Sequence, residues 1–198
     1  ICETDAHSKI EYEENLPKKR ENINFSGRKN PDGYHYEMQR CGSCSLLYAS
    51  SIHEVEFTNQ LYNESNFVYN LELEGLKKTY ESCLTKVEDI IQNKENFLEI
   101  GCGNGFLLEV AIKKGWKNVT GVEPSFEAIN HANKWVKNKI IHSTFESKNF
   151  EKNYYNLVFF AMLIEHVPDV NKFLSGIYDI LKPGGIVIGI CHNERHFL

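Results

Sequence analysis

The sequence has no long hydrophobic run: no apolar stretch approaches the roughly 20 residues that a membrane-spanning helix needs. It also has no basic segment followed by an apolar one at its start, the pattern of a secretory signal peptide. Internal repeats and low-complexity tracts are absent as well. With 41% hydrophobic and 25% charged residues, the 198-residue chain has the composition of an ordinary globular protein. We therefore expect one good-sized domain, or one with a small appendage, and no membrane partner.

Basic residues are outnumbered by acidic ones, which gives a formal net charge of -5. An acidic surface repels phosphate backbones, so nucleic acid is a disfavoured partner. Six cysteines are present, and those beyond the N-terminal region fall in helix-like and strand-like contexts: Cys83, Cys102 and Cys191. Without a signal peptide, this usage favours a reducing cytoplasm over a secreted disulfide framework.

The first residue is Ile1 and not methionine, and the chain stops soon after its last strand-like segment. We expect a piece of a longer protein, with the final strands of its sheet truncated. No feature of the sequence indicates an oligomeric state.

Three segments of different character follow one another along the chain. Residues 1–52 are polar and rich in turn signals, with short β-like stretches at 9–12 and 34–40. Residues 53–93 carry apolar side chains at close to helical spacing, most clearly in their second half. Residues 94–198 alternate between strand and helix patterns. We expect these segments to form a small β module, a helical linker or lid, and the main domain.

The alternation in the last segment predicts short strands joined by helices. Apolar strands are expected at 97–100, 119–122, 139–142, 156–160 and 186–190. Helices are expected at 105–114, at 170–181, and from an N-cap at Ser125 with Ala128, Ile129, Ala132 and Val136 on the inner face. Such alternation is typical of a doubly wound sheet, so the predicted fold class is α/β with a Rossmann-like, mostly parallel sheet.

A glycine-rich loop, 101–105, joins the first of these strands to its helix. Glycines there let the backbone turn sharply and approach a ligand closely at the helix N-terminus. A dinucleotide-binding fingerprint needs its third glycine at the position of Phe106, and a P-loop needs a Lys-Ser/Thr pair. Neither pattern is present, so nicotinamide, flavin and triphosphate ligands are disfavoured.

Two carboxylates flank this loop. Glu123 ends the second strand, where an acid can accept hydrogen bonds from both ribose hydroxyls of an adenosine. Glu99 directly precedes the loop and can accept from the ammonium group of an amino-acid-like ligand; alternatively it is a structural acceptor for N–H groups of the loop. Together the two acids describe a ligand that is an adenosine carrying an amino acid, without phosphate.

At this point four motifs resemble those of one family. Residues 97–105 resemble motif I of class I S-adenosylmethionine-dependent methyltransferases, and 121–125 resemble its acidic ribose-binding loop. Residues 155–169 resemble the strand-four motif, and 181–188 the motif before strand five. The four follow one another in the family's order, which makes their conjunction more specific than any one of them. The resemblance implies S-adenosyl-L-methionine as the cofactor.

The same resemblance assigns cofactor-binding residues. Around the methionine part it places Glu99, Gly101, Cys102, Gly103, Asn104 and Gly105. The ribose loop contributes Glu123, Pro124 and Ser125, and the adenine wall Thr144, Phe145 and Glu146. Ala161 and Met162 flank the cofactor after strand four, and Tyr69, with Tyr62, can close over it or simply pack as an aromatic side chain. Cys102 is interpreted as a small loop filler and not as a nucleophile.

Methyl transfer is an in-line displacement at a sulfonium, for which the protein supplies alignment and desolvation. A hydroxyl or carbon acceptor also needs a base. Glu165 and His166 follow strand four, and in the resembling family this pair stands beside the acceptor, so both are predicted catalytic residues. The structural alternative for His166 is a role in packing before Pro168. His192 and His196 are also expected near the cleft.

The N-terminal cysteines suggest a structural zinc. Cys41 and Cys44 form a C-x-x-C knuckle, and Cys2 is interpreted as the second half of another. These three are the predicted ligands of a zinc-ribbon-like module, with the fourth outside the chain or replaced by Asp5, His7 or water. The alternative is reduced cysteines without metal. The arrangement resembles bacterial methyltransferases with an N-terminal zinc ribbon, many of which act on sugars or other small metabolites.

The predicted function is therefore transfer of a methyl group from S-adenosyl-L-methionine to oxygen or carbon of a small-molecule acceptor, a sugar or another metabolite. One alternative is an RNA methyltransferase that grips nucleic acid through the basic residues 18–20 and 28–29, which glutamates surround. The other is a non-catalytic, zinc-dependent interaction module, against which the intact glycine loop and Glu123 argue.

Overall fold

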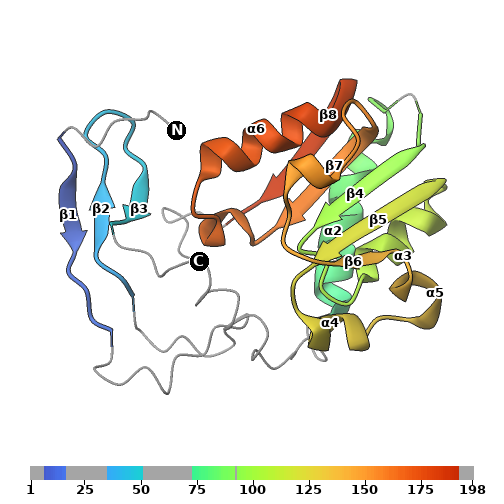
Figure 1. The fold of residues 1–198 in the computed structure, drawn as a ribbon, viewed down its shortest axis with the longest axis horizontal. Helices are drawn as coiled ribbons and strands as arrows, with labels where there is room; N and C mark the ends of the chain where they lie inside the picture. Colours follow the sequence, from blue (N-terminus) through green and yellow to red (C-terminus); the bar gives the residue numbers. More distant parts are fainter. Residues whose placement is uncertain (1–6, 17–34, 51–72, 92, 192–198) are drawn as a thin grey trace. The chain divides into compact units, whose positions relative to one another are not determined.

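The computed structural model describes residues 7–16, 35–50, 73–91 and 93–191. The chain divides into two compact units, residues 1–66 and 67–198 (Figure 1). Within the described residues, no helix is long and apolar enough to cross a membrane.

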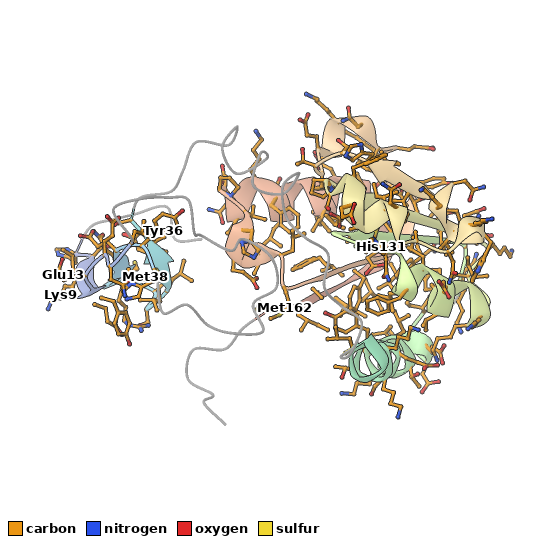
Figure 2. The ribbon with its side chains drawn as sticks, turned by 90° about the horizontal axis from the view of Figure 1, so that it is seen from below. Lys9, Glu13, Tyr36, Met38, His131 and Met162 are labelled. Atoms are coloured by element: carbon orange, nitrogen blue, oxygen red, sulfur yellow. The ribbon has the colours of Figure 1, made fainter. Side chains whose placement is uncertain are left out.

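The first unit contains a small antiparallel sheet of strands β1 (Lys9–Tyr12), β2 (Met38–Arg40) and β3 (Leu47–Ala49), in that order. The β-like stretch at 9–12 is thereby confirmed, and of the one at 34–40 the last three residues form a strand. An ion pair between Arg40 and Glu11 joins β2 to β1. Figure 2 labels Tyr36, which precedes β2, and Met38, the first residue of this strand. The C-x-x-C knuckle forms the tight turn between β2 and β3, closed by a hydrogen bond from the Cys41 N–H to the Leu46 carbonyl (2.9 Å).

The second unit is built on five parallel strands in the order β6-β5-β4-β7-β8. The strands are β4 (Asn96–Ile100), β5 (Asn118–Glu123), β6 (Ile140–His142), β7 (Tyr155–Ala161) and β8 (Leu181–Ile190). The helices are α2 (Leu73–Glu88), α3 (Phe106–Lys113), α4 (Phe126–Asn130), α5 (Lys134–Lys137) and α6 (Val170–Ile180). This order confirms the predicted Rossmann-like, doubly wound α/β fold.

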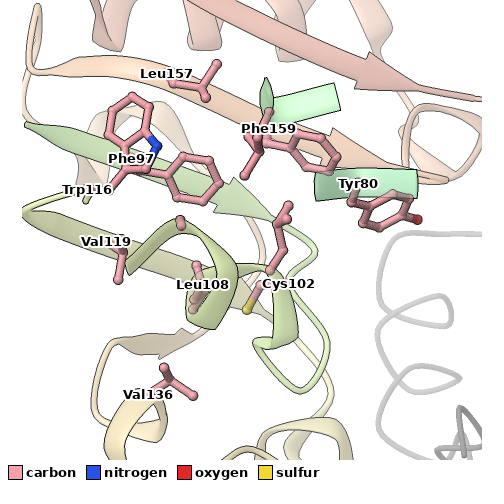
Figure 3. Close-up of a cluster of buried hydrophobic side chains, with 12 residues drawn as sticks. Tyr80, Phe97, Cys102, Leu108, Trp116, Val119, Val136, Leu157 and Phe159 are labelled. Atoms are coloured by element: carbon pink, nitrogen blue, oxygen red, sulfur yellow. The ribbon is translucent and has the colours of Figure 1, made fainter. Parts of the chain in front are cut away.

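Apolar side chains cover both faces of the sheet, as central parallel strands require. On one face Phe97 and Phe159 pack with residues of α2 and α3, and Figure 3 shows Tyr80 and Trp116 in the same cluster. On the other face Leu98, Val158 and Phe160 pack against α6, and the buried residues of that helix are Phe173, Gly176, Ile177 and Ile180. Successive residues of a strand point to opposite faces, and both faces are buried here, which explains why these strands are almost continuously apolar in the sequence.

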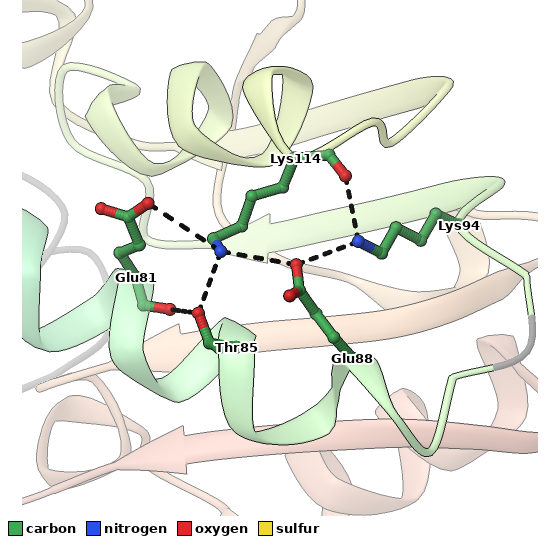
Figure 4. A network of polar contacts seen from close by, with 5 residues as sticks. All are labelled: Glu81, Thr85, Glu88, Lys94 and Lys114. Carbon is green, nitrogen blue, oxygen red and sulfur yellow. Dashed lines mark hydrogen bonds and ion pairs between the residues drawn. The ribbon is translucent and has the colours of Figure 1, made fainter.

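Helix α2 is tied to the end of α3 by a polar network at the surface (Figure 4). The Lys114 ammonium donates to the hydroxyl of Thr85 (2.9 Å) and pairs with Glu88 at 3.4 Å. Glu88 also pairs with Lys94 (2.9 Å), whose ammonium donates to the carbonyl of Lys114 (3.0 Å). Ion pairs at this exposure contribute little individually, so the ring packing of Tyr80 on Phe106 is the firmer link between the two helices.

Two elements have bounds that differ from the sequence prediction, and a third prediction lies partly outside the described residues. The helix expected from Ser125 is split into α4 and α5, because the intervening His131 and Asn133 are weak helix formers. Strand β8 begins at Leu181 and not at 186, since Leu181 already pairs with Tyr155 before an irregularity in the register. Of the helical stretch expected at 57–93, the structure describes α2, and residues 51–72 lie outside the described part of the chain.

Candidate active site

The predicted site residues converge because the five strands are parallel and all end at one edge of the sheet. Strand order reverses between β4 and β7: the chain proceeds outward through β5 and β6, then returns to β7 on the other side. Ligands of open α/β sheets bind at such a switch point, beyond the carboxyl ends of the strands. Here that place is bordered by the loop after β4 and the segment after β7.

The loop after β4 depends on glycine at its two ends. Gly101 has φ +74° and Gly105 φ +72°, in the left-handed region that side chains disfavour. The N–H groups of Gly101 and Cys102 both donate to the carbonyl of Val122, at 2.8 and 3.1 Å. Because Val122 belongs to β5, these bonds hold the loop over the neighbouring strand. The predicted bare-backbone turn is therefore present.

The side chain of Cys102 lies in the hydrophobic core. Its side chain is buried beside Leu108, and the pKa of its thiol is raised well above the usual range by burial and then by the charges of Glu99 and Glu123. A thiol held protonated is a poor nucleophile, which supports its interpretation as a filler. Gly121 makes room for it: a Cβ on Gly121 would lie 2.5 Å from the Cys102 sulfur and 2.9 Å from Leu108.

The carboxylate of Glu123 accepts hydrogen bonds from the backbone of two loops. One carboxylate oxygen accepts the N–H of Gly103 (2.8 Å), and the other accepts the N–H of Ser125 (2.7 Å). The side chain is nearly buried, and burial raises its pKa even though these two hydrogen bonds and nearby His142 act in the opposite direction. Glu123 therefore fixes the glycine loop to the ribose loop through one carboxylate.

Glu99 is the unusual group of the site. Its side chain is 3% exposed, and its Oε2 atom has no hydrogen-bond partner among the described residues. Burial, and then the charge of Glu123, raises the pKa of Glu99 well above its usual range. A buried carboxyl oxygen without a partner is costly, and it marks a place where a donor from outside the chain would be stabilised.

The residues assigned to the ribose and adenine have varied surroundings. The Ser125 hydroxyl accepts the N–H of Ala128 (3.2 Å), which confirms the predicted N-cap of α4. The carbonyl of Pro124 contacts the His142 ring (Nε2, 2.9 Å). After β6, Thr144 and Glu146 are exposed.

Phe145, between these two exposed residues, has its ring in the core. It lies 5.4 Å from the ring of Phe150 and 5.7 Å from that of Phe173 on α6. This packing fixes the direction of the chain after β6, where the adenine wall is predicted.

The segment after β7 carries the predicted catalytic pair. Ala161 ends the strand, and Met162 follows with φ +50°, an uncommon conformation for a residue with a side chain. Glu165 and His166 then lie exposed on a short 3-10 turn, η3 (Ile164–His166). Both are therefore at the carboxyl edge of the sheet, as predicted.

Several candidates lie outside the described residues: Tyr62, Tyr69, His192, His196, Asp5 and Cys2. In the first unit the side chain of Cys41 is buried and that of Cys44 is exposed. Across the described ranges no group of three or more His, Cys, Asp or Glu side chains could hold a metal ion. Of the three cysteines predicted to bind zinc, the structure describes Cys41 and Cys44. The described residues form no metal site around them.

Three residues that sequence reasoning did not select also belong to this edge. Gly121 could have been found, because a glycine inside a strand often marks a close approach of another group. His142 lies opposite Glu123 in the register of β5 and β6. Leu163 packs against Gly101, a contact between distant segments that no local pattern announces.

A parallel sheet in this strand order, with a glycine loop and a buried acid at its carboxyl edge, is the fold of class I S-adenosylmethionine-dependent methyltransferases. The chain belongs to the methyltransferase-domain family, whose sequence profile matches residues 73–197. That match covers the whole second unit from α2 through β8.

Curated relatives resemble only part of the chain. A ubiquinone biosynthesis O-methyltransferase of Coxiella burnetii is 27% identical over 103 residues, which are 50% of this chain and 44% of the relative. The enzyme of the same name from a Bradyrhizobium species is 34% identical over 95 residues, 46% of this chain and 37% of the relative. The chain thus spans less than half the length of these relatives.

Solved methyltransferases match part of the chain. Phosphoethanolamine N-methyltransferase 2 of Haemonchus contortus, in complex with S-adenosyl-L-methionine, has a TM-score of 0.48 at 26% identity, covering 56% of this chain and 27% of that one. An S-adenosylmethionine-dependent methyltransferase of Clostridium acetobutylicum has a TM-score of 0.47 at 19% identity, covering 57% and 49%.

Proposed function

We propose that this chain is the cofactor-binding and catalytic core of an enzyme that transfers a methyl group from S-adenosyl-L-methionine to a small-molecule acceptor. The observation that carries the proposal is the unpaired, buried Oε2 of Glu99 beside the glycine loop 101–105. The residues present fit that cofactor. When bound, it supplies an activated methyl group on a sulfonium sulfur.

Glu99 is the proposed partner of the cofactor's ammonium group. An ammonium beside this carboxyl would satisfy the orphaned oxygen and favour the ionised form, which burial otherwise disfavours. The glycine loop next to it, with Gly101, Gly103 and Gly105 at positive φ, presents backbone without side chains to the methionine part. Asn104 and the backbone at Cys102 complete this wall.

Glu123 is the proposed holder of the ribose. Each of its carboxylate oxygens accepts one backbone N–H and keeps a second lone-pair direction for a hydroxyl donor. Pro124 and Ser125 follow it on the same side, and Thr144 and Glu146 would border the adenine. Ala161 and Met162 would flank the cofactor from β7, and Tyr69 would close over it.

The proposed acceptor is a hydroxyl of a small metabolite. Two curated relatives are O-methyltransferases by name, and a hydroxyl acceptor must lose its proton as the methyl group arrives. His166 is the proposed base, because histidine is suited to proton abstraction near neutral pH and this one is exposed at the carboxyl edge of the sheet. Glu165 would orient the acceptor or the imidazole. Carbon methylation of a sugar remains the competing assignment.

Two measurements test the proposal. Calorimetry of the full chain with S-adenosylhomocysteine is expected to give saturable binding at one site per chain. Methyl transfer from labelled S-adenosyl-L-methionine is then measured against a panel of phenols, catechols and nucleotide sugars, with incorporation expected into a hydroxyl-bearing acceptor. No binding of S-adenosylhomocysteine would contradict the cofactor assignment, and incorporation into sugar carbon alone would contradict the acceptor assignment.

We also infer a structural zinc in the first unit, held by Cys2, Cys41 and Cys44. In support, Ser45 adopts φ +61° after the knuckle, and its N–H donates to the Cys41 carbonyl (2.9 Å), so the turn brings Cys44 back toward Cys41. A Cβ on Gly42 would lie 2.7 Å from the His7 carbonyl oxygen. Cys2 is five positions from His7, within roughly 17 Å of extended chain.

The zinc assignment is tested by metal analysis of the purified chain. We expect about one zinc per chain, lost in Cys44→Ser and retained in the control Cys83→Ser, whose thiol belongs to α2. A metal-free wild-type chain with the same melting temperature before and after chelation would contradict it. Because Cys83, Cys102 and Cys191 of the second unit are free thiols, we further propose a reducing, cytoplasmic location.

A further inference from the structure

Leu163 contacts both sides of the switch point. Its two terminal methyl carbons lie 3.6 and 3.7 Å from the position that a Cβ would take on Gly101, in the glycine loop. Its carbonyl oxygen accepts the N–H of His166 (2.9 Å), which closes the turn η3. One residue thus faces the proposed cofactor loop with its side chain and holds the proposed catalytic turn with its backbone.

Met162 determines where Leu163 points. The Met162 N–H donates to the carbonyl of Ile190 at 2.7 Å, continuing the pairing of Ala161 with Ile190 at the end of β7 and β8. Its φ of +50° then turns the chain sharply out of the strand (Figure 2 labels Met162). A side-chain-bearing residue keeps this conformation only where its surroundings hold it, and such residues gather at functional sites.

Leu163 is also anchored beneath. It is half-buried and packs against the core cluster on the α6 face, which includes Ile100 at the end of β4. The Leu163 methyl groups therefore border the space that a side chain on Gly101 would fill. A movement of the loop toward Leu163 would displace it, and a movement away would widen the gap between them; interiors tolerate neither overlap nor gaps well.

We propose that Leu163 is a positioning residue that couples the glycine loop to the turn carrying Glu165 and His166. This inference rests on the proposed function, because it assigns the two coupled segments to cofactor and acceptor. Ordering of the glycine loop by the cofactor tightens the contact between Gly101 and Leu163, and Leu163 passes this order to η3 through its bond to His166. The acceptor-side residues are then aligned only when the cofactor is in place.

Amide hydrogen exchange of the full chain, with and without S-adenosylhomocysteine, tests the coupling. In the wild type, S-adenosylhomocysteine is expected to slow exchange in both segments, residues 99–106 and 162–167. In Leu163→Ala without ligand, both segments exchange about tenfold faster. With ligand, the variant protects residues 99–106 but no longer 162–167. Leu163→Met, which keeps the reach and volume of the side chain, restores the wild-type pattern.

Leu181→Ala is the matched control. Leu181 is likewise half-buried and packs against the same core cluster, but it lies at the opposite end of β8. Its loss should lower the melting temperature as much as Leu163→Ala without changing exchange in either segment. Should Leu163→Ala fold too poorly, Leu163→Val shortens the side chain while keeping most of the packing.

The outcomes separate the inference from the proposed function. If the wild type gives no heat of binding and no protection from exchange with S-adenosylhomocysteine, the proposed function is contradicted. The comparison of Leu163→Ala with Leu181→Ala without ligand still tests whether Leu163 couples the two segments. A wild type that binds, combined with a Leu163→Ala variant whose two segments behave as in Leu181→Ala, defeats the coupling alone.

Discussion

One carboxylate oxygen of Glu123 accepts the backbone N–H of Gly103 at 2.8 Å, although 20 residues separate them in sequence. The other oxygen accepts the N–H of Ser125, so the acid at the end of β5 holds two loops at once. Hydrogen bonds to a charged acceptor contribute more than neutral ones, about 1.5–3 kcal/mol each. The shape of the proposed cofactor site therefore depends on this side chain even without a ligand.

We expect Glu123→Gln to weaken binding of S-adenosylhomocysteine by at least about tenfold, because an amide can accept on one side only and presents a donor to the other N–H. Calorimetry gives the dissociation constant. The control is Glu127→Gln, an exposed acid in the first turn of α4, for which the affinity should not change. Equal affinities for wild type and Glu123→Gln would remove Glu123 from the cofactor site.

The raised pKa of Glu99 predicts a pH-dependent stability. Its pKa in the folded chain lies above its ordinary value of about 4.5, so the contribution of this group is fully present below that value and is lost as the pH rises through the folded pKa. Glu99→Gln cannot ionise. The melting temperature of Glu99→Gln minus that of the wild type should therefore increase from pH 4.5 upward, in the absence of ligand.

The same shift predicts release of a proton on cofactor binding, since an ammonium beside Glu99 lowers the pKa that burial had raised. Calorimetry with S-adenosylhomocysteine near neutral pH, in buffers of different ionisation enthalpy, measures the number of protons released. The release should vanish in Glu99→Gln. A pH-independent difference in melting temperature, together with no release in the wild type, would show that Glu99 is ionised throughout.

Much of the main domain could be predicted from the sequence because its signals are local. Strands buried on both faces appear as apolar runs, and the glycines at 101–105 mark a turn between strand and helix. The helix cap at Ser125 could also be predicted from the sequence. The break between α4 and α5 could not be predicted, because the buried side chains of Ala128, Ile129 and Val136 continue the apolar inner face across it. There the ring of His131 contacts the Glu127 carbonyl, a local competitor of the helical hydrogen bond.

The candidate site was predictable in its residue types but not in its contacts. Glu99 and Glu123 could be selected by their positions at strand ends. The backbone N–H groups of Gly103 and Ser125, which take up one acceptor position on each Glu123 oxygen, could not be predicted. The position of Leu163 beside Gly101 depends on the left-handed backbone conformation of Met162. Methionine rarely adopts this conformation, so the sequence does not predict it. Contacts across the switch point arise from topology, which single-segment patterns do not encode.

Gly121→Ala should destabilise the fold by about 1–3 kcal/mol, because the added methyl would overlap Cys102 at 2.5 Å and Leu108 at 2.9 Å. Urea unfolding followed by the fluorescence of buried Trp116 measures the loss. The double variant Gly121→Ala/Cys102→Ala should recover part of it, since the sulfur is removed while the clash with Leu108 remains. Gly75→Ala in α2 is the control: within the described residues its Cβ meets nothing within 4 Å, and the helix should gain stability. Equal effects of the single and double variants would contradict the proposed packing.

His166→Ala should separate binding from chemistry. The imidazole is exposed on the turn η3, on the proposed acceptor side of the site, so the affinity for S-adenosylhomocysteine should be unchanged. If the imidazole removes the acceptor proton, kcat falls by about 10²–10⁴-fold. Added imidazole should restore part of the rate, which a purely structural role would not allow. His131→Ala, at the C-cap of α4, serves as the control and should keep the wild-type rate. Full activity of His166→Ala would show that another group is the base. If the affinity for the cofactor falls as much as the rate, the side chain supports the fold of the site and does not transfer the proton.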